Sequence, residues 1–542
     1  MRDFYDVNDA ISPEAANQFN EFVKFCIQQE DVFLRSRGYL VAGIIAKTAG
    51  EGFYPSALSY LEATVKAVRE DPSEVVQVSC IRALQDLLPG LPQSMTKPFQ
   101  APILSTLSDF IAGHDLRDVS EGDDLKFTLA DTLRDTIMVD PNIVLDSIAL
   151  DVLFNIASSG AGNFQLGMMV TETFEQVVEY VAEQGADAYI QLCGKVLPPL
   201  TGALDVGDMT QENALTNLAT DLLRALVENA LQPLPQGLVA NLLPKLNRLL
   251  MTSGDSELLP AATLAVQHML AHDPDQFFGW QDPQSGKGAV ETVLIIIDRL
   301  LGASVDDSAA SEVGELAAEL VEKAGSEKLG PYFPQLLRAV AQRLATAERA
   351  QLIQSLILVF ARLSLISARE VIEFLAQLDI NGQSGLHVVL SKWLENSVNF
   401  AGYDEIRQNV IALSKLYQLN DPRVAQVQVK GDLIIHDTGR IKTRSQSRNN
   451  PDQYTIIPAT LKILKILVEE LSSASGARDF RGVPGAGGAG MDELESDDEN
   501  DDWEDVPSNV LDLGLGITKQ ELMGFAAEDA DGSLATRQRD DE

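Results

Sequence analysis

Apolar residues recur at helical spacing along almost the whole chain, and this pattern limits the fold more than any other feature of the sequence. In the stretch DPSEVVQVSCIRALQDLL, the apolar side chains of Val75, Val78, Ile81, Leu84 and Leu88 follow one another at intervals of three or four residues. Such spacing places them on one face of a helix, which can then be buried. The sequence therefore predicts amphipathic helices.

Asp-Pro pairs stand in front of several of these apolar segments. Asp71 is suited to cap a helix, Pro72 fits the first helical position, and Glu74 stands where a capping box carries its acid. The same pair begins the stretches DPNIVL at Asp140 and DPRVAQV at Asp421. These positions predict helix starts that punctuate the chain repeatedly.

Further amphipathic segments lie between these starts. Their apolar positions are Leu215, Leu218, Leu222 and Leu226; Val290, Val293, Ile297 and Leu300; and Leu352, Leu356, Phe360 and Leu363. The stretch VQVKGDLIIHD is the one short candidate for a strand. Helices of about 12 to 20 residues, paired across short turns, give a unit near the ~40-residue period of helical-hairpin repeats. We therefore expect an all-α solenoid, curved and with a concave surface of the kind that usually binds other proteins.

Length and charge narrow the possible partners. At 542 residues the chain is too long for a single compact core, which agrees with a repeat array. Its formal net charge of -39 repels nucleic acid and anionic membranes and attracts basic proteins. The alternative that the charge only keeps the chain soluble stays open.

The composition divides the chain into five expected parts. They are a repeat array over 1–430, a polar and basic loop over 431–457, a repeat helix over 458–473, a disordered glycine-rich linker with an acidic run over 474–508, and a C-terminal segment over 509–542 that we expect to be incomplete. The loop carries a basic cluster, Arg440, Lys442, Arg444 and Arg448. A nuclear-localisation or nucleic-acid patch is one interpretation. We prefer local docking of this cluster against acidic repeats or the acidic run.

No residue pattern predicts catalysis, a cofactor or a metal site. His268 and His272 are one helical turn apart, but the HEXXH glutamate is missing and no third ligand is evident, so a structural role is favoured. QSGKGA lacks the first glycine and the final Ser or Thr of a phosphate loop, and GQSGL fails as a nucleophile elbow. We therefore expect no enzyme.

Cysteine usage and hydropathy indicate the compartment. Cys26, Cys80 and Cys193 are far apart and odd in number, and no CxxC is present, which favours a reducing compartment and argues against structural zinc. The N-terminal residues lack the layout of a secretory signal. The longest apolar stretch, LIQSLILVFARLSLI, is shorter than the ~20 residues that cross a bilayer, so no membrane insertion is expected.

Several longer strings have a family resemblance. HVVLSKWLENSVNFAGYDEIRQNVIALSKLYQL and the later IKTRSQS, NPDQYTIIP and KILKIL, in this order, resemble the C-terminal half of importin-9 type nuclear transport receptors of the importin-beta superfamily. The segment DDWEDVPSNVLDLGLGITKQELMGF resembles the fungal members of this family. The resemblance implies a HEAT-repeat superhelix that shuttles between cytoplasm and nucleus. It implies as partners core histones and other basic nuclear proteins, the small GTPase Ran in its GTP form, and nucleoporins.

The resemblance also assigns a role to the acidic run. Ten carboxylates and no base lie between Met491 and Asp505, and the family carries a disordered acidic loop at this place that shields basic cargo. The residues that match this loop are Asp492, Glu493, Glu495, Asp497, Asp498, Glu499, Asp501, Asp502, Trp503, Glu504 and Asp505. We expect these residues to bind basic cargo.

Two departures from the family pattern bear on this expectation. The chain begins past the N-terminal repeats that contact Ran in the family, and it stops where the family continues with further helices, so we expect it to be a C-terminal part. The alternative function is a non-catalytic HEAT-repeat scaffold or regulatory protein, for which the acidic run is only a solubilising linker.

Overall fold

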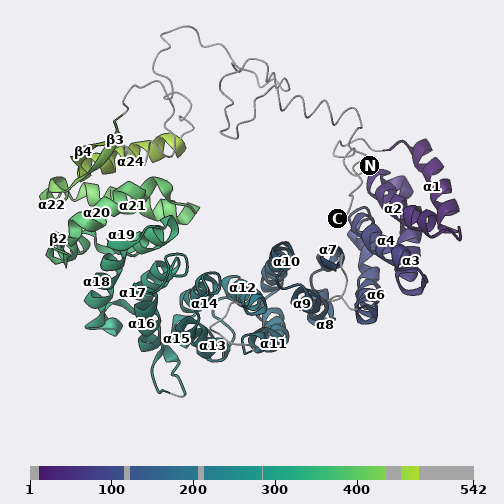
Figure 1. Ribbon diagram of the computed structural model, residues 1–542, viewed down its shortest axis with the longest axis horizontal. Helices are drawn as coiled ribbons and strands as arrows, with labels where there is room; N and C mark the ends of the chain where they lie inside the picture. The colour runs from purple at the N-terminus through teal and green to yellow at the C-terminus, as the bar shows by residue number, and fades with distance from the viewer. Residues whose placement is uncertain (1–10, 115–121, 206–212, 284, 435–452, 475–542) are drawn as a thin grey trace, which may run out of the picture. The chain divides into compact units, whose positions relative to one another are not determined.

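The computed structural model describes residues 11–114, 122–205, 213–283, 285–434 and 453–474. Over these ranges the chain is a succession of helices that pack in pairs, and each pair contacts the next along the sequence (Figure 1). One such pair cannot bury its apolar face alone, so the core is continuous from pair to pair. The expected all-α repeat architecture is confirmed.

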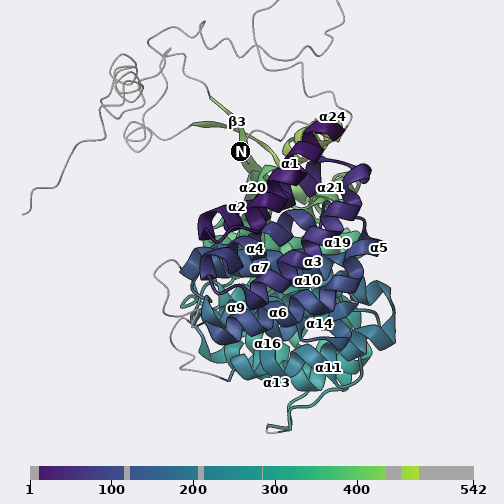
Figure 2. The ribbon, with the colours of Figure 1, turned by 90° about the vertical axis from the view of Figure 1, so that its right-hand side faces the viewer.

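The first helix of each pair belongs to one layer, which Figure 2 shows from the N-terminal end with α1 and α3 in front. The first helices are α1 Pro13–Ile27, α3 Tyr54–Glu70, α6 Gln100–Gly113, α9 Ala149–Ser159, α11 Ala186–Ala203, α13 Leu238–Thr252, α16 Ala289–Leu300, α18 Tyr332–Thr346 and α20 Gly385–Asn396.

The second helices follow one another in direct contact through most of the array, and we call them the second-helix layer. They are α2 Val32–Thr48, α4 Glu74–Leu87, α7 Gly122–Val139, α10 Phe164–Glu183, α12 Ala214–Glu228, α14 Leu258–His272, α17 Val313–Leu329, α19 Ala350–Gln377 and α21 Tyr403–Gln418. Because they touch in sequence order, their side chains form a surface that runs from repeat to repeat.

Short elements join the longer helices. They are η2 Glu51–Phe53, α5 Gln93–Thr96, η3 Lys97–Phe99, α8 Ile143–Asp146, α15 Pro274–Gly279, β1 Asp379–Ile380, β2 Gln383–Ser384, η4 Ser397–Asn399 and α22 Pro422–Gln426. β1 and β2 pair as a minimal antiparallel hairpin between α19 and α20.

The apolar periodicity read from the sequence marks the buried faces. On α12 the side chains of Leu218, Leu222 and Leu226 are buried in the core. Leu356 and Phe360 are buried on α19 in the same way. Each such side chain contributes about 1.5–3 kcal/mol when it is fully buried. These helices are confirmed.

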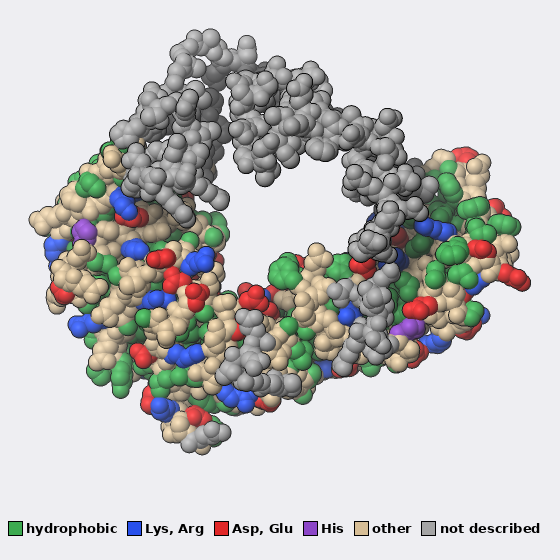
Figure 3. Space-filling view, viewed as in Figure 1, with side chains coloured by type: hydrophobic (Ala, Val, Ile, Leu, Met, Phe, Trp, Pro, Cys, Tyr) green, Lys and Arg blue, Asp and Glu red, His purple; other side chains and the backbone are tan. Residues whose placement is uncertain are grey.

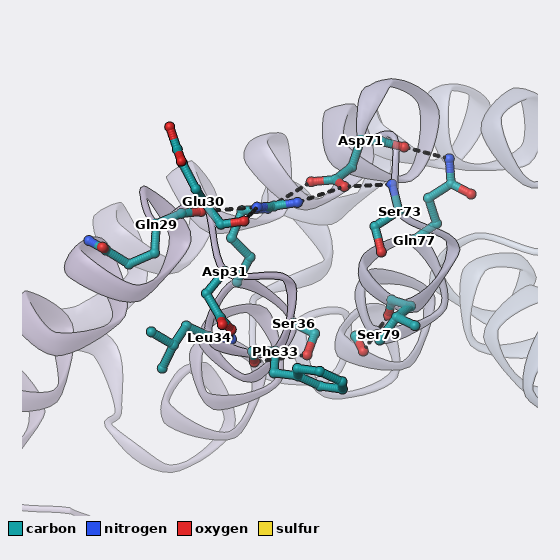
Figure 4. Close-up of polar contacts among 12 residues, drawn as sticks. Gln29, Glu30, Asp31, Phe33, Leu34, Ser36, Asp71, Ser73, Gln77 and Ser79 are labelled. Carbon is teal, nitrogen blue, oxygen red and sulfur yellow. Dashed lines mark hydrogen bonds and ion pairs between the residues drawn. The ribbon is translucent and has the colours of Figure 1, made fainter.

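The start of α4 differs from the expected capping box (Figure 4). The helix begins at Glu74 with Ser73 as its N-cap, and no side chain caps it. The carboxylate of Asp71 instead accepts hydrogen bonds from the Ser73 amide at 2.9 Å and from the Arg35 guanidinium at 3.1 and 3.2 Å. Because Arg35 lies on α2, Asp71 ties one repeat to the next.

The Asp-Pro pair at Asp421 behaves as expected. Asp421 is the N-cap of α22, Pro422 occupies the first turn, and the Asp421 carboxylate accepts a hydrogen bond from the Arg423 amide at 2.9 Å. The start signal is therefore confirmed here.

A β-hairpin and one helix end the described array. Strand β3, Gln428–Leu433, pairs antiparallel with β4, Tyr454–Pro458, and α24, Ala459–Ala474, follows directly. The strand expected in VQVKGDLIIHD is confirmed. The segment expected as a polar loop over 431–457 thus begins and ends in paired strands.

Helix α19 is the one helix, among the described residues, that is long and apolar enough to cross a membrane. Its helical geometry breaks at Ser367, and it packs against α17, α18, α20 and α21. Leu352, Leu356 and Phe360 point into that packing and are fully buried. Its apolar composition is that of a core helix.

Candidate binding surface

The two charged segments singled out in the sequence lie outside the described residues. These are the acidic run Asp492–Asp505 and the basic cluster Arg440, Lys442, Arg444 and Arg448. The structure therefore places neither of them, and their roles stay predictions. Ion pairs lie on both layers of the described chain, and those of the second-helix layer link helices that contact one another in sequence order.

Arginines of the second-helix layer hold carboxylates of the same or the preceding helix. On α7 the guanidinium of Arg134 lies 2.6 Å from Asp131 and 2.9 Å from Asp135. On α12 the Arg224 Nη2 atom lies 2.8 Å from Glu175 Oε1 of α10. The sequence pattern does not reveal the Arg224–Glu175 pair, because its two residues are 49 positions apart.

A third arginine forms ion pairs between two later helices of the layer, α17 and α19. Arg362 of α19 lies 2.7 Å from the Glu319 carboxylate of α17 and also pairs with Glu322. Glu319 is only 5% exposed. Red and blue side chains lie together over this part of the molecule in Figure 3. The arginine and its glutamates thus form an ion-pair network between neighbouring repeats.

Some carboxyl groups of this layer have a raised pKa, because nearby cations do not fully offset the effect of their burial. Burial raises the pKa of Glu315 on α17 to about 7, and Glu312, Glu405 and Glu319 add repulsion that Arg362 only partly offsets. Burial also raises the pKa of Asp135. Carboxyl groups of this kind are costly to ionise, and a cation close by would stabilise their charged form. These carboxyl groups therefore hold a proton more readily than exposed carboxyl groups do.

An open groove lies between α10 and α12, and we call it the α10–α12 groove. Its volume is about 710 Å³. A separate cavity of about 390 Å³ is lined by Leu215 and Leu218 among others. The groove is lined by carboxylates of Glu172, Asp221 and Glu257 and by the exposed side chains of Phe164 and Met168. Its size is typical of ligand sites.

The histidine pair lies on α14 with ring centroids 5.9 Å apart. Burial, together with His272 and Arg224, lowers the pKa of His268 to about 4. Within the part of the chain that the structure describes, no group of three or more His, Cys, Asp or Glu side chains is arranged to hold a metal ion. The pair packs inside the array beside the ion pairs of α12 and α17.

The three cysteines are free and buried. Burial raises the pKa of the Cys80 and Cys193 thiols, that of Cys193 to about 11. Because the thiolate is the nucleophile and the metal-binding form, these thiols are inert at neutral pH.

Two family descriptions match successive parts of the chain. Importin-9 central HEAT repeats match residues 1–161, and Importin-11-like, TPR repeats match residues 170–431. The chain is 28% identical over 529 residues to importin subunit beta-5 of Schizosaccharomyces pombe, a match that covers 95% of this chain and 49% of the relative. This chain belongs to the importin-beta superfamily.

The chain is also similar to a second curated relative and to a solved structure. Importin subunit beta-5 of Saccharomyces cerevisiae is 28% identical over 366 residues, which is 67% of this chain and 35% of that protein. A crystal structure of importin beta aligns with 87% of this chain and 55% of its own length at 14% identity, with a TM-score of 0.48. The chain spans about half the length of the first curated relative and about a third of the second.

Membership in this superfamily confirms two expectations from the sequence. The resemblance to importin-9 type receptors is confirmed, and so is the expectation that the chain is not an enzyme, because its relatives are importins. HEAT and TPR repeats are both stacked helix pairs, so the two matching descriptions fit one continuous array.

Proposed function

We propose that this chain is part of a nuclear import receptor that carries and chaperones basic nuclear proteins, with core histones as a cargo. The observation that carries the proposal is the combination of superfamily membership with a formal net charge of -39. A strongly anionic repeat array attracts polycations over long range and speeds their encounter.

The acidic run supplies a further part of this attraction. Ten carboxylates between Met491 and Asp505 face no base within the run. A single exposed ion pair contributes only about 0–1 kcal/mol, but many such pairs add to a few kcal/mol without a fixed geometry. We propose that Asp492–Asp505 shield basic cargo in this way and that the binding is salt-sensitive.

The remaining steps of transport belong to the proposal for the whole receptor. In it, Ran in the GTP form governs cargo release, nucleoporins guide passage through the pore, and the receptor shuttles between cytoplasm and nucleus. Superfamily membership supports these steps, and in the proposal this chain contributes repeats that contact the cargo.

The first experiment measures binding of the chain to a fluorescently labelled core histone dimer by anisotropy, across a salt series. Three proteins are compared: the intact chain, the chain without residues 492–505, and a chain of unchanged length in which the Asp and Glu residues of that run become Asn and Gln. We expect tight binding that weakens with salt, and an equal loss of about tenfold in the deletion and the neutralised variant.

Each other result contradicts part of the proposal. Equal affinity of all three proteins would remove the acidic run from cargo binding. A folded chain that binds no histone at low salt would contradict the receptor function and favour a HEAT-repeat scaffold whose charge serves solubility.

A further inference from the structure

The α10–α12 groove combines negative charge with exposed apolar side chains. Phe164 is 78% exposed and Met168 is 48% exposed, although both lie on α10 within the array. They face the same groove as the carboxylates of Glu172, Asp221 and Glu257. Exposed aromatic and methionine side chains next to carboxylates are typical of a surface that binds a partner.

The carboxylate of Asp221 has no hydrogen bond or ion pair among the described residues. The nearby guanidinium of Arg224 is occupied, because it lies 2.8 Å from Glu175 and also pairs with Glu228. Burial raises the pKa of Asp221 to about 6, because the nearby charge of Arg224 offsets the burial only in part and Glu257 and Glu175 add repulsion. A cation in the groove would therefore gain a partner that the protein itself leaves unpaired.

A second acceptor in the groove is also unused. The Oδ1 atom of Asn217 is buried and has no hydrogen-bond partner among the described residues, while its amide nitrogen donates to Asp255 at 3.0 Å. Asn217 and Asp221 are four residues apart on α12, and both line the groove. An unpaired buried oxygen is uncommon in folded proteins, and a hydrogen-bond donor from a ligand would satisfy it.

The helix starts around the groove do not offer a site for an anion. Asn163 accepts a hydrogen bond from the Leu166 amide of α10, and Asn213 accepts one from the Leu215 amide of α12. Asp255 accepts one from the Glu257 amide ahead of α14, at 2.8 Å. Because these side chains cap the amides that would bind an anion, the free groups of the groove are acceptors and apolar surface.

We propose that the α10–α12 groove binds an arginine or lysine side chain of an extended peptide together with an adjacent apolar side chain. The basic group lies between Asp221 and the Asn217 oxygen, and the apolar side chain packs on Phe164 and Met168. This inference rests on the proposed function, since it gives basic cargo a defined site on the array. The groove would also require an apolar side chain next to the basic one in the peptide, which attraction between charges alone does not require.

The probe is a fluorescein-labelled peptide with one Leu-Arg-Leu core in a glycine and serine background. Matched peptides carry Gln in place of Arg, or Ser in place of both Leu residues. With the full chain at low ionic strength, we expect each change in the peptide to weaken binding by about five- to tenfold.

Two variants of the chain test the groove. Asp221→Asn keeps the shape and removes the charge, and it should weaken binding of the Leu-Arg-Leu peptide by about tenfold. Asp187→Asn, an exposed acid on α11 in the other layer, makes the same charge change and should have no effect. Phe164→Ala should weaken binding of the Leu-containing peptide and leave the affinity for the Ser-containing peptide unchanged. Circular dichroism checks that each variant is folded.

The outcomes separate this inference from the proposed function. If Asp221→Asn and Phe164→Ala bind the peptide as tightly as the unchanged chain, the groove is not the site, even where histone binding persists. If the variants lose the peptide while no variant binds histones, the groove stands and the histone proposal fails. Equal binding of the Arg and Gln peptides would also overturn the inference.

Discussion

Two pairs of neighbouring helices in the second-helix layer are each joined by an arginine–glutamate ion pair, but the two ion pairs differ in how far they are exposed. Between α17 and α19, Arg362 pairs with Glu319, and between α10 and α12, Arg224 pairs with Glu175. The Glu319 side chain is 7% exposed, whereas that of Glu175 is 36% exposed. The first pair is sealed between helices, and the second lies beside an open groove.

Two glycines show how closely the helices approach at each step. A Cβ atom on Gly314 of α17 would overlap the backbone of Ser355 in α19, so these helices touch backbone to backbone. A Cβ atom on Gly167 of α10 would meet nothing within 4 Å, although Gly167 lines the α10–α12 groove. The spacing between helices therefore decides whether the charges hold the array together or stay available to a partner.

The largest expected effect comes from removing the two arginines. Arg362→Met leaves buried Glu319 with only Lys323 at 3.6 Å, and we expect a loss of about 3 kcal/mol in local stability. Arg224→Met, at the more exposed pair, should cost about 1 kcal/mol or less. Hydrogen exchange of the α17 and α19 amides, compared with those of α10 and α12, measures each loss. Equal losses at both steps would contradict the comparison.

The glycine pair tests the same comparison through packing. Gly314→Ala should destabilise the α17–α19 step by about 2 kcal/mol, because α19 must move away to admit the methyl group. Gly167→Ala should be neutral or stabilise by about 0.5–1 kcal/mol, because alanine is the better helix former. Thermal unfolding together with local hydrogen exchange measures both, since long repeat arrays need not unfold in one step. A destabilising Gly167→Ala would contradict the difference in packing between the two steps.

The sequence predicted the helices well because their evidence is local. The spacing of Leu218, Leu222 and Leu226 fixes a buried face regardless of what packs on it. The start at Asp421 is equally local, but the one at Asp71 failed because the carboxylate binds Arg35, 36 positions away. Local patterns carry no information about such distant partners.

The candidate site was much harder to predict from the sequence. Phe164 and Met168 alternate along the sequence with the buried Leu166 and Met169. Their apolar character alone therefore does not show that they line the groove and are not part of the core. Asp221 stands in a strongly amphipathic helix like any solvated acid. Its unpaired state depends on Arg224 being held by Glu175, a contact between two repeats. Only the stacking of the repeats brings these groups into one groove.

The smallest expected effect is a pH dependence confined to the open step. The pKa of Asp221 is raised to about 6, so its carboxylate is mostly protonated near pH 5 and mostly ionised near pH 7.5. Affinity for the Leu-Arg-Leu peptide should therefore rise by about fivefold over this range, since arginine stays charged throughout. Glu172, Glu257 and Arg224 line the same groove, and Glu175 pairs with Arg224, so the measurement needs a control that isolates Asp221.

The Asp221→Asn variant provides that control. Its affinity should be weak and nearly flat over the same pH range if Asp221 is the titrating group. The sign for folding is the opposite of the sign for binding. A carboxyl group with a raised pKa in the folded chain favours folding less as the pH rises through about 6, so the free chain loses stability where the peptide binds best. If the Asn variant kept the full pH dependence of peptide binding, the titrating groups would be the other carboxylates. The charges of the groove would then have a structural role, like the ion pairs between α17 and α19.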